Sequence, residues 1–172
     1  TLMNALTRSD VLTRSQLFST LDPTTRRLRL SDTETVLLTD TVGFIQKLPP
    51  AIIAAFRATL EELSEADILI HVVDLTSHNA AEQCETVEDI LRELGLKEKP
   101  RLTVLNKIDL MLDKSQLWDE EKALKYLAEK AGRDDENNVL VSAVKGWGLS
   151  KVKEKISSML QKEKPLDSVE AE

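Results

Sequence analysis

The chain contains the segment Leu102-Thr103-Val104-Leu105-Asn106-Lys107-Ile108-Asp109. Its first four residues are apolar or β-branched, which is typical of a short buried strand. Its last four place an amide, an amine and a carboxylate directly after that strand. A solvated turn with a helix cap is the alternative explanation, but Asn-Lys-x-Asp after a buried strand is a specific pattern. The segment therefore predicts a ligand-binding loop at the carboxyl end of a strand.

Strand and helix patterns alternate on both sides of this segment. Apolar runs predict strands at 26–30, 34–40, 68–73, 102–105 and 139–141, the first two joined by a turn at 31–33. Helical spacing of apolar residues predicts helices at 1–7, 51–66, 79–94 (with Gly95 as C-cap), 115–131 and 149–160. Residues 8–25 have no sustained period and predict a loop.

This alternation predicts an α/β fold, with a mostly parallel sheet covered by helices on both faces. The run Ile68–Val73 is apolar at almost every position, which favours a strand buried on both faces. Ligands of such sheets bind outside the carboxyl ends of the strands. Asp40-Thr41-Val42-Gly43 and Ser142-Ala143-Val144-Lys145-Gly146 follow two other strands. We expect these two segments and Asn106–Asp109 to converge on one edge of the sheet.

The residue types in Asn106–Asp109 and in the segment 142–146 suit a guanine base. Guanine presents a ring N1–H beside an exocyclic amino group, and the carboxylate of Asp109 can accept from both, a pair that adenine does not offer. Asn106 would address the opposite edge and tether neighbouring loops. The apolar stem of Lys107 can lie over the base face. The backbone N–H of Ala143 would donate to the guanine carbonyl oxygen.

The residues after the 34–40 strand suit a nucleotide's phosphates. Asp40 is a carboxylate that could hold Mg²⁺, usually through water. Gly43 has no side chain, so its N–H can approach a γ-phosphate. These assignments predict a nucleoside triphosphate and Mg²⁺ as ligands.

Composition excludes several other classes of protein. The 172 residues carry 23 Lys and Arg against 30 Asp and Glu, a net charge of −7, which argues against broad neutralisation of nucleic-acid phosphates. No run of about 18 apolar residues predicts a membrane span. Cys84 is the single cysteine, so there is no internal disulfide framework, and we expect no zinc site because no His/Cys cluster has metal-ligand spacing. We interpret His71 as a core residue and Cys84 as an unreactive one.

With these motifs, the chain resembles the translation-factor-like P-loop GTPases. The stretch Gln16-Leu17-Phe18-Ser19-Thr20-Leu21-Asp22-Pro23-Thr24-Thr25-Arg26-Arg27, followed by Leu38-Thr39-Asp40-Thr41-Val42-Gly43-Phe44-Ile45, is similar to the HflX family of ribosome-associated GTPases. The resemblance covers about residues 1 to 160. It implies a P-loop NTPase fold, binding and hydrolysis of GTP with Mg²⁺, GDP as product, and the large ribosomal subunit as partner.

The resemblance also implies roles for residues that chemistry alone does not assign. Thr20 corresponds to the switch I threonine, which contacts Mg²⁺ and the γ-phosphate, so Thr20 and Asp40 are the implied metal-binding residues. Together with Gly43 they form the implied catalytic set. Phe44 stands where many GTPases carry a water-orienting Gln, so intrinsic turnover should be slow. The full implied nucleotide-binding set is Phe18, Ser19, Thr20, Leu21, Asp22, Asp40, Thr41, Val42, Gly43, Asn106, Lys107, Ile108, Asp109, Ser142, Ala143 and Val144.

In HflX-like proteins the Walker A loop, Gly-x-x-x-x-Gly-Lys-Ser, directly precedes Thr-Leu-x-Asn. That tetrad is here Thr1-Leu2-Met3-Asn4, so we expect this chain to start just after the Walker Ser and to lack the first strand and the P-loop. We expect residues 1–161 to form the truncated G domain and 162–172 a polar, disordered tail. Nucleotide binding by the chain alone should be weak, because the missing loop supplies the anion-binding N–H groups.

The amino-acid sequence alone leaves three questions open. The first is whether the chain is a GTPase domain or a non-catalytic ribosome- or protein-binding module that has lost its P-loop. The second is whether a related family such as Obg or Era fits better, although the segment Leu21–Arg27 argues against it. The third is the compartment, which is the cytoplasm in a bacterium and the chloroplast or mitochondrion in a eukaryote. The basic run Arg26, Arg27 and Arg29 could touch ribosomal RNA, but we favour a solvated strand face.

Overall fold

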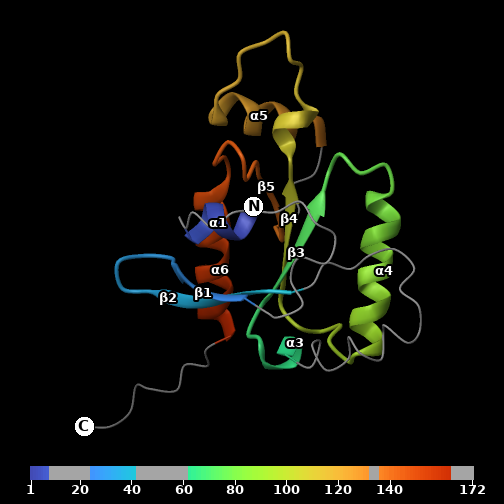
Figure 1. The fold of residues 1–172 in the computed structure, drawn as a ribbon, viewed down its shortest axis with the longest axis vertical. Coiled ribbons are helices and arrows are strands. Elements are labelled where there is room, and N and C mark those ends of the chain that lie inside the picture. Colours follow the sequence, from blue (N-terminus) through green and yellow to red (C-terminus); the bar gives the residue numbers. More distant parts are fainter. Residues whose placement is uncertain (8–23, 42–61, 132–135, 164–172) are drawn as a thin grey trace.

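The computed structural model describes residues 1–7, 24–41, 62–131 and 136–163 (Figure 1). Its helices are α1 (Leu2–Thr7), α3 (Glu62–Glu65), α4 (Ala80–Glu93), α5 (Glu120–Ala131) and α6 (Leu149–Glu163), with a short 3₁₀ helix, η1 (Ile108–Met111). Its strands are β1 (Thr24–Arg29), β2 (Thr35–Asp40), β3 (Leu69–Asp74), β4 (Arg101–Asn106) and β5 (Asn138–Leu140).

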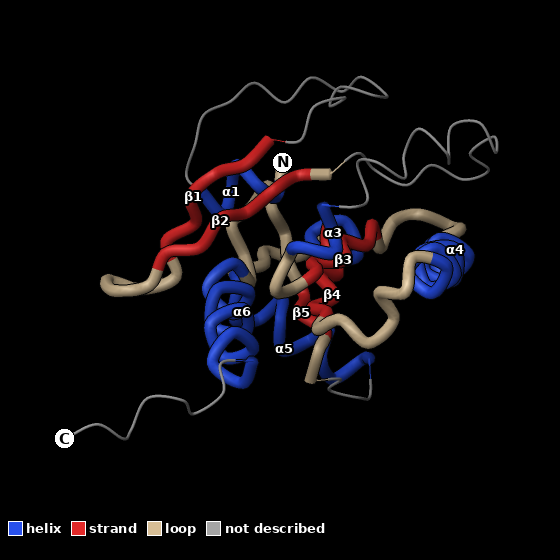
Figure 2. Tube along the Cα trace, turned by 90° about the horizontal axis from the view of Figure 1, so that it is seen from below, coloured by secondary structure: helices blue, strands red, loops and turns tan. Residues whose placement is uncertain are grey.

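Three parallel strands in the order β3-β4-β5 form the sheet that positions the predicted site. Asp74, the last residue of β3, pairs with Asn106, the last residue of β4. Helices α4 and α6 lie on opposite sides of this sheet (Figures 1 and 2). The predicted parallel sheet with helices on both faces is therefore confirmed for these strands.

The first two strands form a separate antiparallel sheet. Within the described residues β1 pairs only with β2, from Thr24 opposite Asp40 to Arg29 opposite Thr35. The hairpin is the antiparallel part of a fold that was predicted to be mostly parallel, and within the described residues it forms its own sheet. The physical reason is the short turn, which sends β2 back along β1, whereas parallel neighbours need a long crossover.

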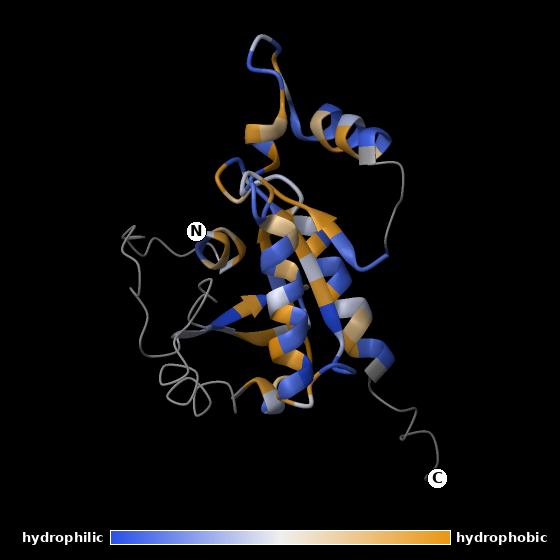
Figure 3. Cartoon of the chain, turned by 90° about the vertical axis from the view of Figure 1, so that its right-hand side faces the viewer, coloured by the Kyte–Doolittle hydropathy of each residue, from blue (hydrophilic) through white to orange (hydrophobic). Residues whose placement is uncertain are grey.

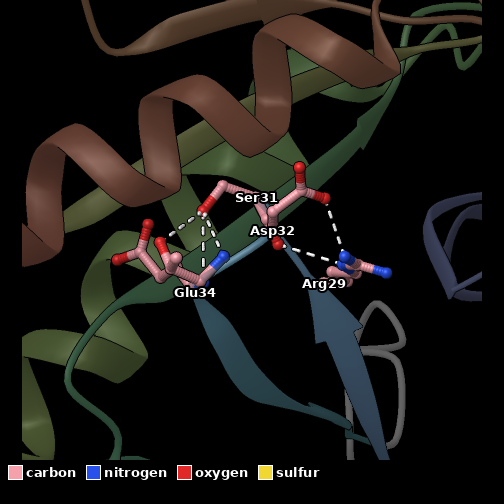
Figure 4. Close-up of polar contacts among 5 residues, drawn as sticks. Arg29, Ser31, Asp32 and Glu34 are labelled. Atoms are coloured by element: carbon pink, nitrogen blue, oxygen red, sulfur yellow. Dashed lines mark hydrogen bonds and ion pairs between the residues drawn. The ribbon is translucent and has the colours of Figure 1, made fainter.

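A serine organises the turn of the hairpin (Figure 4). The Ser31 hydroxyl oxygen accepts hydrogen bonds from the backbone N–H groups of Thr33, at 3.3 Å, and Glu34, at 3.1 Å. Arg29 donates to the carbonyl of Ser31 and pairs with Asp32 at 2.7 Å. A side chain that bonds to backbone a few residues ahead is the usual way in which Ser shapes a turn, and it confirms the predicted turn at 31–33.

One hydrophobic cluster joins the two sheets. Its buried members come from α1, β1, β4, β5, the residue after β5, and α6: Leu6, Leu28, Leu102, Val104, Val139, Val141, Val152 and Ile156. Figure 3 shows apolar residues concentrated on the central strands, while the helices alternate between polar and apolar residues. A second, smaller cluster packs α4 on β3 through Leu69, Val87 and Leu91. Helix α6 therefore covers both sheets, and α4 covers only one.

Strand β3 is less buried than its sequence predicts. Val72 is 47% exposed and His71 is partly exposed. Within the described residues β3 is an edge strand of its sheet, because it pairs only with β4. The prediction that Ile68–Val73 is buried on both faces is therefore wrong for its central residues.

The ends of the helices follow local capping chemistry. Helix α4 has Asn79 as N-cap and Leu94 as C-cap, and Gly95 follows at φ 72° with its N–H bonded to the carbonyl of Arg92. This left-handed glycine confirms the predicted helix end. Helix α6 continues to Glu163, so the helix includes the first two residues of the predicted tail.

Helix α5 begins at Glu120 rather than at the predicted Ser115. The Asp113 carboxylate accepts the backbone N–H of Ser115 at 2.8 Å, and the Asp119 carboxylate accepts that of Lys122 at 2.9 Å. These bonds make a turn at Asp113 and cap the helix at Asp119. They hold the pKa values of both carboxyls below their ordinary range. The predicted helix began too early because the periodicity of apolar residues continues across this turn. Asp113 and Asp119 are the residues that indicate the turn and the true start of α5.

Candidate guanine-binding site

The predicted polar residues after β4 and β5 lie together at one end of the parallel sheet. Beyond β5 the chain stays beside β4, because Val141 N–H donates to Leu105 at 2.9 Å and Ile108 N–H donates to Val141 at 3.3 Å. The loops 106–109 and 142–146 are therefore neighbours, although more than thirty residues separate them in sequence. This is the position that parallel topology predicts for a ligand site.

Asn106 ties the two loops to each other. Its side-chain oxygen accepts the backbone N–H of Ala143 at 3.1 Å and that of Lys107 at 2.8 Å. Ala143 is buried, so its N–H requires an acceptor, and Asn106 supplies it. The predicted tethering role of Asn106 is confirmed. The Ala143 N–H, predicted to face a guanine carbonyl, donates to Asn106 in this structure.

Asp109 is oriented by Ser142. The Ser142 hydroxyl donates to one carboxylate oxygen of Asp109 at 2.6 Å and accepts the backbone N–H of Lys145 at 3.2 Å. Ser142 is completely buried, and its backbone pairs reciprocally with Trp147 at 3.1 Å. Within the part of the chain that the structure describes, the other oxygen of Asp109, Oδ2, has no hydrogen-bond partner. A fixed carboxylate with one oxygen available can accept from a donor pair such as that of guanine.

Two residues of the predicted set differ sharply in burial. Ile108 is completely buried, so its side chain belongs to the packing below the loop and not to a ligand surface. Val144 is 76% exposed and projects from the loop. The 3₁₀ helix η1 begins at Ile108 and buries this residue, while Lys107 before it is exposed.

Lys107 has an unusual backbone. Its φ is 67°, and it is the single non-glycine residue with positive φ among the described residues. Its ammonium pairs with Asp74 at 2.6 Å. Sequence reasoning placed Lys107 in the site but assigned no role to Asp74. The signal that could have found it is its position at the end of the neighbouring parallel strand.

Two glycines shape the loop that follows Ser142. Gly146 and Gly148 have φ values of 76° and 74°. A Cβ on Gly148 would lie 2.1 Å from the carbonyl oxygen of Leu140, whereas a Cβ on Gly146 would meet nothing within 4 Å. The N–H of Gly148 donates to Glu120 at 2.8 Å. Gly148 therefore allows the loop to close onto β5, a role that the sequence pattern did not indicate.

The predicted phosphate and metal residues are only partly described. Asp40 ends β2 and is exposed, and Thr41 follows it. Within the described ranges, no hydrogen bond or ion pair links either residue to the loops after β4 and β5, so the predicted convergence of all three segments is not seen for Asp40. The remaining predicted residues lie outside the described residues: Phe18, Ser19, Thr20, Leu21, Asp22, Val42 and Gly43.

Asp40 alone is a limited metal site. Among the described residues no three His, Cys, Asp or Glu side chains come together as a cation-binding group. Mg²⁺ in nucleotide sites is held by one or two protein oxygens together with phosphates and water, so a lone exposed carboxylate fits that chemistry as a partial ligand.

None of the described helices combines the length and hydrophobicity needed to span a membrane.

A second group of titratable residues lies between β3 and α4, away from these loops. Arg101 pairs with Glu88 at 2.5 Å. Burial and the nearby Arg101 charge lower the pKa of His71 against the opposing charge of Glu88. Burial, and then Glu88, raise the pKa of the Cys84 thiol despite Arg101. Because a thiol with a raised pKa forms less thiolate, this supports the interpretation of Cys84 as unreactive.

Comparison with known proteins places this geometry in a family. The sequence profile described as 50S ribosome-binding GTPase matches residues 1–107, which is more than half of the chain. The chain belongs to this family of GTPases. A second profile, described as the GTP-binding domain of elongation factor Tu, matches residues 55–162. Together the two matches cover nearly all of the described residues.

The most similar relatives include proteins named GTPase HflX. The one from Caldanaerobacter subterraneus subsp. tengcongensis is 52% identical over 111 residues, which are 64% of this chain and 26% of the relative. The one from Escherichia coli is 37% identical over 166 residues, 95% of this chain and 36% of the relative. The resemblance to the HflX family is thereby confirmed. The chain spans only about a quarter to a third of these relatives.

Solved structures confirm the G-domain fold of P-loop GTPases. A GTP-binding protein from Sulfolobus solfataricus, in complex with GDP, has a TM-score of 0.68 and 29% identity, over 95% of this chain and 49% of that one. The G domain of FeoB from Methanococcus jannaschii has a TM-score of 0.55 at 24% identity, over 93% of this chain and 88% of that one, and supports the fold alone.

Proposed function

We propose that this chain is the guanine-nucleotide-binding part of a ribosome-associated GTPase of the HflX kind, which hydrolyses GTP and acts on the large ribosomal subunit. The observation that carries the proposal is the linked pair of loops, in which Asn106 binds the Ala143 N–H and Ser142 orients Asp109. These bonds create a preformed edge with a carboxylate acceptor, as guanine requires. Membership of a family described as ribosome-binding supports the choice of partner.

In the proposed complex each residue of the loops has one task. Asp109 accepts from the guanine N1–H and amino group through its available oxygen. Asn106 holds the two loops at the correct spacing. The Lys107 stem covers one face of the base, and the Ala143 N–H is shared between Asn106 and the guanine carbonyl oxygen. The buried Ser142 keeps Asp109 from rotating away.

The catalytic assignments remain part of the proposal. Thr20, Asp40 and Gly43 would hold the phosphate end, with Thr20 and Asp40 also contributing to a Mg²⁺ site. When bound, Mg²⁺ would supply charge neutralisation at the phosphates. Phe44 cannot orient water, so turnover should be slow until a partner or a backbone group supplies that help.

The 172 residues contain no Gly-x-x-x-x-Gly-Lys-Ser motif. We therefore expect this chain alone to bind GTP and GDP weakly and to hydrolyse GTP very slowly. We also propose that a further parallel strand completes the sheet. This is supported by β1–β2 and β3–β5 being separate hydrogen-bonded sheets that share one hydrophobic cluster.

Domain limits and location follow the same family argument. We propose residues 1–161 as the G-domain portion, followed by a polar tail, although helix α6 continues to Glu163. The HflX relatives named above come from bacteria, which favours the cytoplasmic location among the three compartments considered.

Asp109→Asn tests the base assignment. Asparagine presents an N–H₂ donor that suits the second carbonyl of xanthine and opposes the amino group of guanine. We expect GDP affinity to fall more than tenfold, about the loss of one charge-assisted pair, and xanthosine diphosphate to bind better than GDP. Titration calorimetry with both nucleotides measures this. Asp119→Asn is the matched control, because Asp119 caps α5 outside the site. Unchanged guanine preference would overturn the assignment.

The alternative is a non-catalytic ribosome- or protein-binding module. Thr20→Ala separates the two functions. If Thr20 acts in a GTPase switch, Thr20→Ala should weaken Mg²⁺-dependent GTP binding or turnover more than it weakens GDP binding. Equal effects on both nucleotides, with ribosome binding retained, would favour the module.

A further inference from the structure

A carboxylate on the neighbouring strand holds the ammonium of Lys107. The Lys107 Nζ donates to Asp74 Oδ2 at 2.6 Å. Asp74 is the last residue of β3, and the register of the sheet places it beside Asn106, the residue before Lys107. The two side chains are 47% and 36% exposed, so solvent reaches both. The contact therefore links the end of β3 to the base-binding loop across one strand spacing.

Asp74 is itself fixed by the turn that follows β3. Its other oxygen, Oδ1, accepts the backbone N–H of Thr76 at 2.9 Å and the Thr76 hydroxyl at 2.7 Å. Burial opposes ionisation of Asp74, but the hydrogen bonds from Lys107 and Thr76 outweigh it and lower the pKa of this carboxyl. The carboxylate is therefore charged at neutral pH, with one oxygen for its own turn and one for Lys107.

Lys107 is constrained at its backbone as well. Its left-handed conformation is one that residues with a Cβ seldom adopt, and its N–H is bonded to the Asn106 side chain at 2.8 Å. The side chain is thus fixed at the Cα by this loop and at Nζ by Asp74. The four methylene groups span the distance between these two points and present an apolar surface beside the loop.

We propose that Asp74 is a positioning residue that holds the Lys107 stem as a wall for the face of the guanine base and keeps its ammonium away from the phosphates. This rests on the proposed function, since it assumes that the base occupies the loop Asn106–Asp109. The contact neutralises a cation that would otherwise be attracted to the phosphates of a nucleotide. Asp74 therefore contributes to recognition of the base and not of the phosphates.

The test uses Asp74→Asn in the complete 172-residue chain. Asparagine keeps an oxygen for the Thr76 turn and removes the charge that holds Lys107. Binding of guanosine and of GDP is followed by the ¹H–¹⁵N shift of the Ala143 amide, with circular dichroism to confirm folding. We expect guanosine affinity to fall about three- to tenfold and GDP affinity to fall less, because the released ammonium can reach the phosphates. Asp89→Asn, which breaks the similar exposed pair with Arg92, is the matched control.

A double-mutant comparison distinguishes positioning from a merely structural role. Lys107→Met keeps the length of the stem and removes the ammonium. If Asp74 acts through Lys107, Asp74→Asn has no further effect in the Lys107→Met background. An equal loss in both backgrounds, or a change below twofold in the parent background, overturns the proposal.

One readout does not depend on a ligand. Lys107→Met should raise the pKa of Asp74, measured from its ¹³C carboxyl shift, because it removes a favourable partner. An unchanged pKa overturns the proposal whatever the ligand does. A folded parent chain that shows no preference for guanosine over adenosine overturns the proposed function instead, and the role of Asp74 in base recognition with it.

Discussion

The parallel sheet β3-β4-β5 and the antiparallel hairpin β1–β2 differ in where the carboxyl ends of their strands lie. In the parallel sheet all carboxyl ends lie on one edge, so Asn106 and Ala143 meet although 37 residues separate them. In the hairpin, Asp40 lies opposite Thr24, at the start of the same unit. Strand direction therefore decides which polar residues form a common site.

The two regions also differ in what stabilises them. The parallel strands contribute the completely buried Leu102 and Val104 to the main cluster. The hairpin contributes Leu28, but Leu37 on its other face is 70% exposed and its turn is held by local polar contacts. Substitutions of buried residues of the parallel sheet should therefore cost more stability than substitutions on the exposed face of the hairpin.

The largest effect is expected where the loop after β5 closes onto the sheet. Gly148→Ala places a Cβ against the carbonyl oxygen of Leu140 at a residue with φ 74°, so the backbone must move. We expect a loss of more than about 4 kcal/mol in the free energy of unfolding, measured by urea denaturation. Gly146→Ala has a similar φ but open space, and should cost only about 1 kcal/mol. Equal losses would show that φ alone, and not the close approach, matters.

The next comparison sets a buried position of the parallel sheet against the exposed face of the hairpin. Leu102→Ala removes a completely buried side chain from the centre of the parallel sheet and should cost about 3 kcal/mol. Leu37→Ala removes an exposed side chain from the hairpin and should change stability by less than about 0.5 kcal/mol. Thermal and urea unfolding measure both. A comparable loss for Leu37 would mean that the outer face of the hairpin is covered in the folded protein.

A third comparison sets a hydrogen bond to a buried N–H in the parallel region against an exposed hydrogen bond in the hairpin. Asn106→Ala leaves the buried N–H of Ala143 without its acceptor, and should cost about 1–3 kcal/mol. Thr25→Val removes an exposed hydroxyl pair with Thr39, at 2.9 Å across the hairpin, and should cost less than about 0.5 kcal/mol. If Asn106→Ala were equally mild, the two loops would be held together by something other than Asn106.

The smallest expected effect is a pH dependence carried by His71 in β3. The folded-state pKa of His71 is lowered by burial and Arg101, so the unfolded chain binds the proton more readily. His71 should therefore reduce stability as pH falls below about 6.5, by at most about 1.4 kcal/mol per pH unit, until the folded state is also protonated. Unfolding of the parent and His71→Gln proteins at pH 7 and 5.5 measures this, with His78→Gln as control. An identical pH dependence in parent and His71→Gln would contradict the assignment.

Local signals predicted most of the elements. The apolar runs and Gly95 placed β4, β5 and α4 within one or two residues, because buried strands and helix caps leave signatures in short windows. The start of α5 was wrong because a periodic pattern continued across the Asp113 turn. The burial of β3 was wrong because exposure at an edge depends on neighbours that the pattern does not contain.

The candidate site also has features that the sequence predicted and features that only the structure showed. The residue types Asn106, Asp109 and Ser142 already indicated a guanine site, since the chemistry of a base edge limits which side chains can address it. The close packing of Gly148 against Leu140 could not be predicted from spacing, and the link of Lys107 to Asp74 can be inferred only once β3 and β4 are known to be neighbours. Each joins segments that are distant in sequence.

The sequence by itself thus predicted the local structure of this chain. It indicated which segments are strands, which are helices, and which loop contains the candidate base-binding residues. The pairing of β2 with β1, the Asp74–Lys107 contact and the cluster joining Leu28 to Leu102 were settled by folding. The physical reason is that propensity and capping act over a few residues, whereas register and burial depend on elements brought together from distant parts of the chain.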